Sequence, residues 1–418
     1  MGEIIDHRRL DCGLALAVLP MPRRPLVALD IRVFAGFAFE PPESLGLCHV
    51  LDEAITKGTA RHDGRGLNDA FDAIGAAHGS HPGRELMRFA GLCLPEHFER
   101  LVELHAEMIR TPTFPEEACR VAVELTRQAL DALADDPAEL ARKLLHRRAY
   151  NPPLDRHVLG EAETLAGVGR EQLLEHWRRC FSAPRMLAAV AGAVEASAAA
   201  DVLERAFEGF GGGPAGDGAR PGFSLKLSGG YEHHPKDLEQ THVVMCFPGA
   251  TATDPDFPVE QVALGVLDGG MSGRLFTEVR EKQGLVYWVG AWSDQPSRGG
   301  AVHLGASTTP ENLERTCATL LGEVDRLGRD LSEAEVRRAI TGIVARARTR
   351  GDVTQARASR LADDLFFYGR PIPLEEKIAR VEAVTVEDVR AYLARRPRDV
   401  LAAVTLGPAG LKDGVPRP

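Results

Sequence analysis

Hydrophobic and polar residues recur with two different periods along the first half of the chain, and these periods predict both strands and helices. Alternation at 12–19 and 26–34 predicts two antiparallel strands joined by the proline-rich turn PMPRRP. Further strands are predicted at 85–94, directly after the turn HGSHPGR, and at 186–194. Apolar residues at helical spacing predict helices at 66–75, 95–110, 114–134, 137–149 and 169–180.

The segment SLGLCHVLDEAITKG, from Ser44 to Gly58, has the pattern of one amphipathic helix. Ser44 is suited to cap its start and Gly58 to end it. On such a helix His49 and Glu53 lie four residues apart on one face, with Asp52 beside them. Imidazole and carboxylate groups are the donors from which zinc sites are built. This helix is therefore the first candidate for chemistry.

The second half of the chain repeats the first. GGGPAGDGARPG at 211–222 predicts a linker, because glycine and proline at this density do not hold a packed element. Three matches then occur in the same order at one offset of about 216 residues, which indicates a duplicated domain. They are VLD at 50–52 with VLD at 266–268, TFPEEACRVA at 113–122 with DLSEAEVRRA at 330–339, and AGVGREQLLEHW at 166–177 with EAVTVEDVRAYL at 382–393.

We therefore expect an α+β fold of two homologous domains, at 1–210 and 223–418. Each domain is predicted to be a mostly antiparallel sheet with helices covering one face. A length of 418 residues provides for two sizeable cores.

Composition narrows the function classes. The net charge of −10 argues against a nucleic-acid partner, because neutralising phosphates requires clustered Lys and Arg. The seven Cys are scattered without a C-x-x-C pair, so neither a disulfide framework nor a structural zinc site is expected. The N-terminus has neither a membrane-spanning apolar run nor the pattern of a signal peptide, so we expect a cytoplasmic protein with no membrane partner.

The duplication, the pentapeptide HVLDE and the segment GRLFTEVREKQGLVYWVG at 273–290 together resemble the insulinase/pitrilysin family. HVLDE is similar to the inverted zinc motif H-x-x-E-H of this family. The resemblance covers essentially the whole chain, including FDAIGAA at 71–77 and LPEHFERLVELHAEMIRTPTF at 94–114. It points to the bacterial members of similar length and to the mitochondrial processing peptidase subunits. It implies two α+β domains that enclose a chamber, and zinc-dependent cleavage of peptides.

The resemblance also implies that the zinc motif of this chain is degenerate. The second His of the family motif is replaced by Glu53, and its Glu base is shortened to Asp52. The family's third ligand, a Glu on a later helix, falls at Ala129, which has no donor atom. Glu117 and Glu124 reproduce the carboxylate spacing of that helix only if about five residues have been deleted.

The second half keeps the features that the first has lost. Arg280 and Tyr287 match the Arg/Tyr pair that the family carries in its C-terminal domain. A guanidinium and a phenol can hydrogen-bond a peptide carbonyl and stabilise the oxyanion that forms when water attacks it. Arg274 is a further candidate for binding substrate at the chamber wall.

Three hypotheses follow. In the first, the chain binds no metal firmly and is not active alone. It is the zinc-less subunit of a heterodimeric peptidase: it binds the peptide along an exposed sheet edge and donates Arg280 and Tyr287 to a homologous partner that carries zinc. In the second, it is itself a metal-dependent peptidase with ligands His49, Glu53 and Glu124 and with Asp52 as base. In the third, it is a structural or peptide-binding subunit without a catalytic part.

Overall fold

A computed structural model describes residues 3–211, 222–396 and 400–414, and the chain forms two compact units. Most of the predicted linker, 212–221, lies outside the described residues. Each unit is assembled from three separate segments of sequence. Unit 1 comprises Met1–Ala132, His157–Gly222 and Thr349–Leu374, and unit 2 comprises Leu133–Arg156, Phe223–Arg348 and Glu375–Pro418.

Unit 1 is built on a six-stranded sheet with the order β1-β2-β6-β3-β5-β4. Its strands are β1 Asp6–Arg9, β2 Ala15–Pro20, β3 Val27–Val33, β4 Ala77–Pro82, β5 Met87–Cys93 and β6 Met186–Gly192. Its helices are α1 Leu47–Ile55, α2 Gly64–Asp72, α3 Phe98–Arg110, α4 Glu116–Leu133, α6 Ala162–Leu165, α7 Arg170–Cys180, α8 Ala196–Phe207 and α12 Thr354–Phe367. Four short 3-10 turns, at η1 Phe37–Phe39, η2 Pro42–Ser44, η3 Pro95–His97 and η4 Ala183–Arg185, connect these elements.

Unit 2 is built on a five-stranded sheet with the order β7-β11-β8-β10-β9. Its strands are β7 Gly230–Pro235, β8 Thr241–Pro248, β9 Val286–Asp294, β10 Ala301–Thr308 and β11 Ala402–Gly407. Its helices are α5 Pro137–Ala149, α9 Phe257–Leu267, α10 Leu313–Asp330, α11 Glu333–Gly351, α13 Leu374–Glu382 and α14 Val386–Arg395, with the π-helix η5 Leu275–Glu281 and the 3-10 turn η6 Pro310–Asn312.

The two sheets share one topology, which confirms the predicted α+β fold of two homologous layers. The order β2-β6-β3-β5-β4 in unit 1 matches the order β7-β11-β8-β10-β9 in unit 2. In each sheet one pair is parallel, β2 with β6 and β7 with β11, and the other pairs are antiparallel. Two of the three sequence matches fall at equivalent helix starts, those of α4 and α11 and those of α7 and α14.

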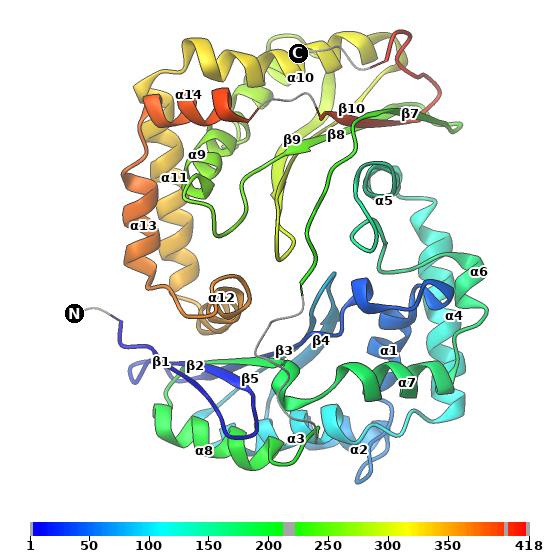
Figure 1. The fold of residues 1–418 in the computed structure, drawn as a ribbon, viewed down its shortest axis with the longest axis vertical. Helices are drawn as coiled ribbons and strands as arrows, with labels where there is room; N and C mark the ends of the chain where they lie inside the picture. Colours follow the sequence, from blue (N-terminus) through cyan, green and yellow to red (C-terminus); the bar gives the residue numbers. More distant parts are fainter. Residues whose placement is uncertain (1–2, 212–221, 397–399, 415–418) are drawn as a thin grey trace. The chain divides into compact units, whose positions relative to one another are not determined.

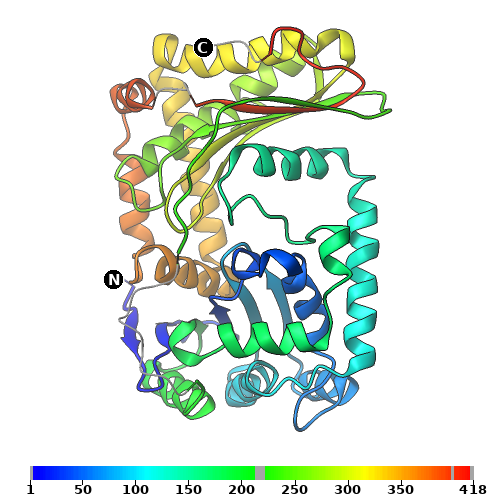
Figure 2. The ribbon, with the colours of Figure 1, turned by 45° about the vertical axis from the view of Figure 1, so that its right-hand side comes forward.

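Each sheet is buried on both faces, because alternate side chains of a strand point to opposite sides. In unit 1 one face packs against α3 and α8 among others, and the other is covered by α12 (Figure 1). In unit 2 the face that includes Val244, Cys246 and Val404 packs against α5, and the opposite face packs on the layer that contains α10 (Figure 2). The covering helix of each sheet is thus a segment from the other half of the sequence.

Of two predictions for unit 1, the first is confirmed and the second is wrong. The strands predicted at 12–19 and 26–34 form as β2 and β3 and run antiparallel, but β6 lies between them and pairs with both. The segment predicted as a turn, HGSHPGR, contains the edge strand β4. Strand β4 pairs on one edge only and most of its side chains are not buried, so its residues can be polar or glycine. Its sequence therefore has no apolar alternation, which is the pattern that would indicate a strand.

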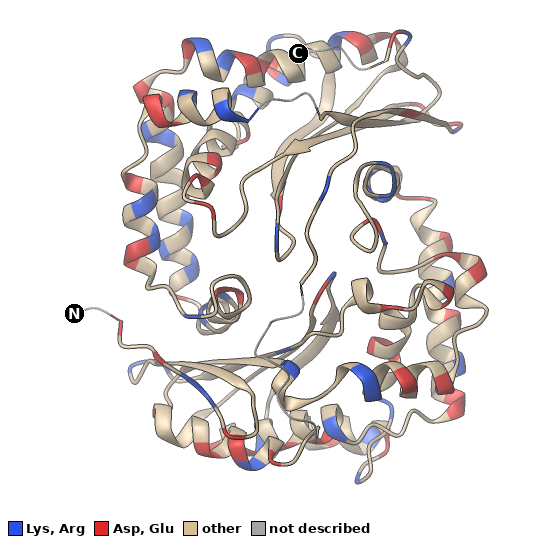
Figure 3. Ribbon diagram, viewed as in Figure 1, with Lys and Arg blue, Asp and Glu red and all other residues tan. Residues whose placement is uncertain are grey.

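Charged residues of both signs are interspersed over the helices of each unit, while the strands are largely uncharged (Figure 3). Within the described ranges, no helix is both long and apolar enough to cross a bilayer.

Candidate functional site

The motif helix α1 begins two residues later than predicted, and a carboxylate from an earlier turn caps it. Gly46 is the N-cap residue, with φ of 94°, a conformation that favours glycine. The Glu40 carboxylate accepts hydrogen bonds from the backbone N–H of Gly46, at 3.0 Å, and of Cys48, at 2.6 Å. Ser44, the predicted cap, ends η2 instead. The start of α1 is therefore held by a buried acid.

His49 points from α1 toward α4. Its Nδ1 lies 2.9 Å from Thr126 Oγ1, and the Thr126 hydroxyl donates to the Ala122 carbonyl at 2.8 Å. Because the Thr126 proton is already used, its oxygen accepts from Nδ1–H of His49. This bond fixes the tautomer and leaves Nε2 as the nitrogen with a lone pair. Burial lowers the pKa of His49, although Glu53 acts in the opposite direction, so the ring is neutral near pH 7.

Asp52 reaches from α1 toward the edge strand β4. Burial raises its pKa, against the lowering effect of a hydrogen bond from Ser80 of β4, and neighbouring Glu53 raises it further. Within the described residues the other oxygen, Oδ1, is buried without a hydrogen-bond partner. Such an atom is costly in a folded protein and is often found where a ligand or water completes the site. Asp52 and Ser80 therefore join the motif helix to the open edge of the sheet.

The side of α4 that faces His49 carries no carboxylate. Ala129 lies three residues after Thr126 and so on the same side of the helix. Glu124 lies two residues before Thr126, which at 100° per residue places it on the opposite side. There it is exposed, and hydrogen bonds from Arg127, at 2.8 and 3.0 Å, and from Gln128, at 2.9 Å, lower its pKa to about 2. Glu117 is also exposed and pairs with Arg120.

The residues at this motif do not fit a zinc site. A catalytic zinc ion needs three protein donors and an open position for water. Within the described residues, His49 and Glu53 belong to no group of three His, Cys, Asp or Glu side chains whose ligand atoms are close enough to share an ion. The structure brings His49, Asp52 and Glu53 together on one helix and leaves Glu124 apart from them. We therefore derive no metal-dependent step at this helix.

Strand β4 forms one edge of the unit 1 sheet and pairs within it only with β5. The backbone groups on its outer side are therefore available to an added strand. Its side chains include His78, which stacks on Phe71 with ring centroids 3.8 Å apart, and the exposed His81. Because α1 packs against β4, this edge runs beside the motif helix. Sequence reasoning missed β4, Ser80 and Thr126, because none of them has an apolar period or a motif.

In unit 2 the Arg/Tyr pair is assembled by two irregular elements. Arg280 lies on the π-helix η5, and π-helical turns frequently mark functional sites. Tyr287 lies on the edge strand β9 at a β-bulge, because Trp288 pairs with Ser307 while Val286 pairs with Thr308. A bulge re-aims a side chain that would otherwise follow the pleat. The bulge leaves Tyr287 77% exposed and Trp288 39% exposed.

Arg280 and Tyr287 are in direct contact. The Arg280 guanidinium lies 5.3 Å from the centre of the Tyr287 ring and 5.0 Å from that of Phe276, within the range of cation–π attraction. Within the described residues of unit 2, no carboxylate forms an ion pair with Arg280, so its donors remain available. The two sequence-predicted side chains thus lie in contact, with Tyr287 exposed and Arg280 partly buried.

Arg274, the third predicted substrate-binding residue, has a different environment. It is buried and donates two hydrogen bonds to Glu335, at 2.7 and 2.9 Å, and one to Asp330, at 2.7 Å. These bonds tie the start of η5 to the end of α10 and the start of α11. Because its donors are used within unit 2, we leave Arg274 out of the proposed site.

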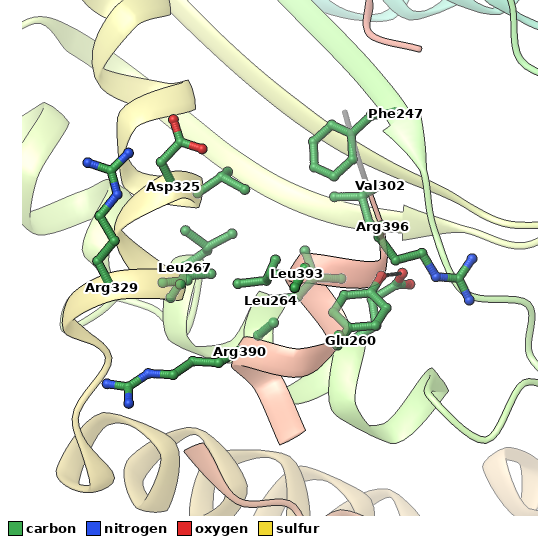
Figure 4. Close-up of a pocket in the computed structure, with 16 residues that line it drawn as sticks. Phe247, Glu260, Leu264, Leu267, Val302, Asp325, Arg329, Arg390, Leu393 and Arg396 are labelled. Carbon is green, nitrogen blue, oxygen red and sulfur yellow. Dashed lines mark hydrogen bonds between the residues drawn. The ribbon is translucent and has the colours of Figure 1, made fainter. Parts of the chain in front are cut away.

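A cavity of about 310 Å³ in unit 2 lies between α9, α10 and α14. Leu264, Leu267 and Leu393 line its apolar centre, and Figure 4 shows Arg329 and Arg390 pointing away from it. The carboxylate of Glu260 at its wall is bonded to Ala250 N at 2.6 Å, Ser293 Oγ at 2.9 Å and the Tyr392 hydroxyl. Because this polar group is already satisfied, the cavity is not a candidate for catalysis.

Two family models match the chain. The model described as "Insulinase (Peptidase family M16)" matches residues 17–162, and the model described as "Peptidase M16 inactive domain" matches residues 167–343. An uncharacterized zinc protease of Rickettsia bellii is 25% identical over 414 residues, covering 98% of this chain and 99% of the relative. A probable mitochondrial-processing peptidase subunit beta of Arabidopsis thaliana is 24% identical over 392 residues, covering 91% of this chain and 74% of the relative.

Two solved structures have the same fold. A peptidase M16 inactive domain from Pseudomonas fluorescens superposes with a TM-score of 0.87 at 20% identity, covering 99% of this chain and all of that one. A protease from Helicobacter pylori gives a TM-score of 0.87 at 14% identity, covering 97% and 99%. At these identities the likeness establishes the fold.

Proposed function

The chain belongs to the insulinase family of peptidases, peptidase family M16, and from this premise we propose that it is the non-catalytic subunit of a heterodimeric zinc endopeptidase. As a whole it is a homologue of zinc proteases of this family. In the proposed complex it binds the peptide and contributes Arg280 and Tyr287, while a homologous partner with a complete H-x-x-E-H motif holds the zinc.

The observation that carries this proposal is the side of α4 that faces His49. It presents a hydroxyl at Thr126 and a methyl group at Ala129, where coordination would require a carboxylate. His49 itself is still oriented by its Nδ1 bond, as a metal-binding histidine would be. A helix that keeps the first ligand and its support but has no third ligand is the arrangement expected of a subunit that has lost hydrolysis.

The chemistry proposed for Arg280 and Tyr287 is the stabilisation of negative charge. In the attack of water on a peptide bond, the carbonyl oxygen becomes an oxyanion. The Arg280 guanidinium supplies several N–H donors and the Tyr287 phenol one O–H donor. The exposure of Tyr287 supports a role toward another molecule, and the Arg280–Tyr287 contact holds the two donors together.

Peptide binding is proposed at the outer edge of β4. An extended peptide that adds to a sheet edge gains main-chain hydrogen bonds that are independent of sequence. The unit 1 edge would then hold the substrate backbone in a fixed register.

Neither rival hypothesis has a specific observation in its favour. An autonomous peptidase requires His49, Glu53 and Glu124 to converge on one ion, and Glu124 faces the other side of α4. A subunit without a catalytic part would give Tyr287 no reason to remain exposed, and Arg280 no reason to lack a carboxylate partner among the described residues of unit 2. That second rival is tested directly by the experiment below.

The test is reconstitution of cleavage. The purified chain is mixed with a homologous zinc-bearing subunit that has a complete H-x-x-E-H motif, and hydrolysis of a fluorogenic peptide is followed. We expect cleavage only in the mixture, and removal of an oxyanion donor by Arg280→Ala is expected to reduce kcat by roughly a hundredfold. The control is Arg337→Ala, which removes an exposed arginine of α11 in the same unit.

Two outcomes contradict the proposal. Unchanged cleavage with Arg280→Ala would leave the chain a structural or peptide-binding subunit. Zinc bound near one per chain and lost with His49→Ala would make it a metal-binding peptidase in its own right.

The compartment we propose is the cytoplasm, which is supported by the absence of disulfides among the seven cysteines.

A further inference from the structure

Three side chains that no sequence motif connects come together in unit 2. His146 lies on α5, Asp294 at the end of β9, and His303 in the middle of β10. One ligand atom from each lies within 4.8 Å of the others, and among the described residues this is the one such group of three His, Cys, Asp or Glu. It shares no residue with the motif helix or with the Arg/Tyr pair.

The group is organised around one hydroxyl. The Tyr150 hydroxyl donates a hydrogen bond to Asp294 Oδ2 at 2.8 Å. The hydroxyl oxygen of Tyr150 also lies 2.8 Å from His303 Nε2. His146 Nε2 lies 3.8 Å from Asp294 Oδ2. Because the proton of Tyr150 goes to Asp294, its oxygen accepts from His303. Tyr150 thereby orients two of the three donors, as residues behind metal ligands do.

The surroundings of the group are rigid on one side and open on the other. His303 is fully buried, and its ring stacks on Trp292 with centroids 5.3 Å apart at 14°. The His146 ring lies edge-on to His303, at 5.7 Å. The side chains of His146 and Asp294 are each 21% exposed, so an ion can reach the group from solvent.

We propose that His146, Asp294 and His303 bind a divalent transition-metal ion of the zinc class. Two imidazoles and one carboxylate are a donor set that suits Zn²⁺ and its neighbours. In a tetrahedral site with bonds of about 2.0 Å, ligand atoms lie about 3.3 Å apart, so each donor needs to move by only about 1 Å. Such a shift is within reach of side-chain rotation at the partly exposed His146 and Asp294.

The function of the ion would be to fasten α5 to the sheet of unit 2. Helix α5 comes from the first half of the sequence and packs on β8 and β11. An ion shared between His146 of α5 and the strands β9 and β10 adds a bond between these segments that the unfolded chain does not offer. Binding to the folded state alone stabilises it in proportion to the ion's concentration and affinity.

The experiment uses the full chain, freed of metal with a chelator, and Zn²⁺ alone as the probe. Equilibrium dialysis with elemental analysis gives the stoichiometry, and thermal unfolding gives the stabilisation. We expect one Zn²⁺ per chain and a higher Tm, with affinity reduced roughly a hundredfold or more by His146→Gln or by Asp294→Asn. Two controls, His234→Gln at another partly exposed histidine of unit 2 and His49→Ala, should bind as the unaltered chain does.

A second measurement is independent of the folding of these variants. Cu²⁺ quenches tryptophan fluorescence at short range, and Trp292 stacks on His303. Addition of Cu²⁺ to the unaltered chain should therefore quench a component that is missing in Trp292→Phe and that excess Zn²⁺ restores. No zinc binding, or zinc binding without this quenching, overturns the proposal. Zinc that is lost with His49→Ala but kept with His146→Gln overturns it too, and also contradicts the proposed function.

Discussion

His49 and Thr126 join α1 to α4 through a hydrogen bond of 2.9 Å between Nδ1 and Oγ1. The bond leaves Nε2 of His49 as the nitrogen with a lone pair, as in a histidine whose other nitrogen is fixed by a hydrogen bond. The other two ligand positions of the family are occupied by Glu53, in place of a His, and by Ala129, in place of a Glu. We therefore propose that the motif helix is the remnant of a metal site, in which the first ligand and its support are kept and the other ligands are replaced.

This relationship predicts that zinc binding can be restored. Glu53→His with Ala129→Glu supplies the two missing donors, and we expect it to bind one Zn²⁺ per chain. The matched control is Glu53→His with Arg127→Glu, which places the new carboxylate on the exposed side of α4. Both are measured by equilibrium dialysis in a His146→Gln background, so that the proposed site of unit 2 does not contribute. Equal zinc content in the two variants would show that Ala129 does not face His49.

Asp52→Asn is expected to stabilise unit 1 at neutral pH. Burial raises the pKa of Asp52 in the folded chain, so the ionised carboxylate is destabilising above that pKa, and the unaltered protein loses stability as pH rises from the ordinary aspartate value of 3.8. The asparagine keeps the shape and removes the charge. We expect a gain in the free energy of unfolding at pH 7, which disappears below pH 3.8.

Urea unfolding at several pH values measures this difference, with Asp69→Asn on the exposed face of α2 as the control. A gain that is constant with pH would mean that the charge of Asp52 is not its cause.

The parts of the fold that follow from local period were predictable, and those that depend on distant partners were not. The apolar residues of α4 and α7 recur at helical spacing, so both helices were predicted within a few residues, and their sequence matches fall at the starts of α11 and α14. Strand β4 was missed because an edge strand with polar residues has no apolar alternation. The role of Thr126 depends on His49, 77 residues away, and a single sequence contains no signal for that pairing.

The cap of α1 could not be predicted from the sequence either, although the capping residue is close to the helix in the chain. Ser44 is a suitable capping residue, but the buried Glu40 carboxylate provides two hydrogen bonds and takes its place. Arg274 and Arg280 could not be distinguished by sequence either, because both precede the β9 edge in one polar segment. Arg274 has two carboxylate partners, whereas Arg280 has none among the described residues of unit 2, and only the structure shows this difference.

The two arginines are predicted to affect different properties: Arg274 the stability of unit 2, and Arg280 cleavage by the reconstituted pair. Arg274→Ala leaves the partly buried Glu335 without its partner, and we expect a loss of about 2 kcal/mol in the stability of unit 2. Arg280→Ala removes only ring contacts and is expected to cost less than about 1 kcal/mol, while it reduces cleavage in the reconstituted pair. Urea unfolding followed by tryptophan fluorescence measures the stabilities. A larger loss for Arg280→Ala would make that residue structural.

Acid sensitivity provides a second measure of the Arg274 ion pair. Burial tends to raise the pKa of Glu335, but hydrogen bonds from Arg274 and Ser332 outweigh it and lower the pKa from 4.5 to about 2. The stability that this carboxylate contributes is present above pH 4.5 and is lost as the pH falls toward about 2. In Arg274→Ala this part of the acid dependence should be missing.

The proposed role of β4 leads to a prediction about two neighbouring residues. In an edge strand, alternate N–H groups point toward the paired strand and away from it, so of Gly79 and Ser80 one donates to β5 and the other faces outward. Proline removes the N–H and is tolerated in a strand only where that group is unpaired. One of Gly79→Pro and Ser80→Pro should therefore lower the unfolding midpoint. The other should keep stability and weaken peptide binding by roughly tenfold, because it removes a main-chain bond to the added strand.

Fluorescence anisotropy measures the binding of a labelled peptide that the reconstituted pair cleaves. Ser80→Ala is the control for the hydroxyl that bonds Asp52. If the proline variant that keeps its stability binds the peptide as tightly as this control does, the peptide does not add to β4, and substrate binding has to be assigned to another surface of the chain.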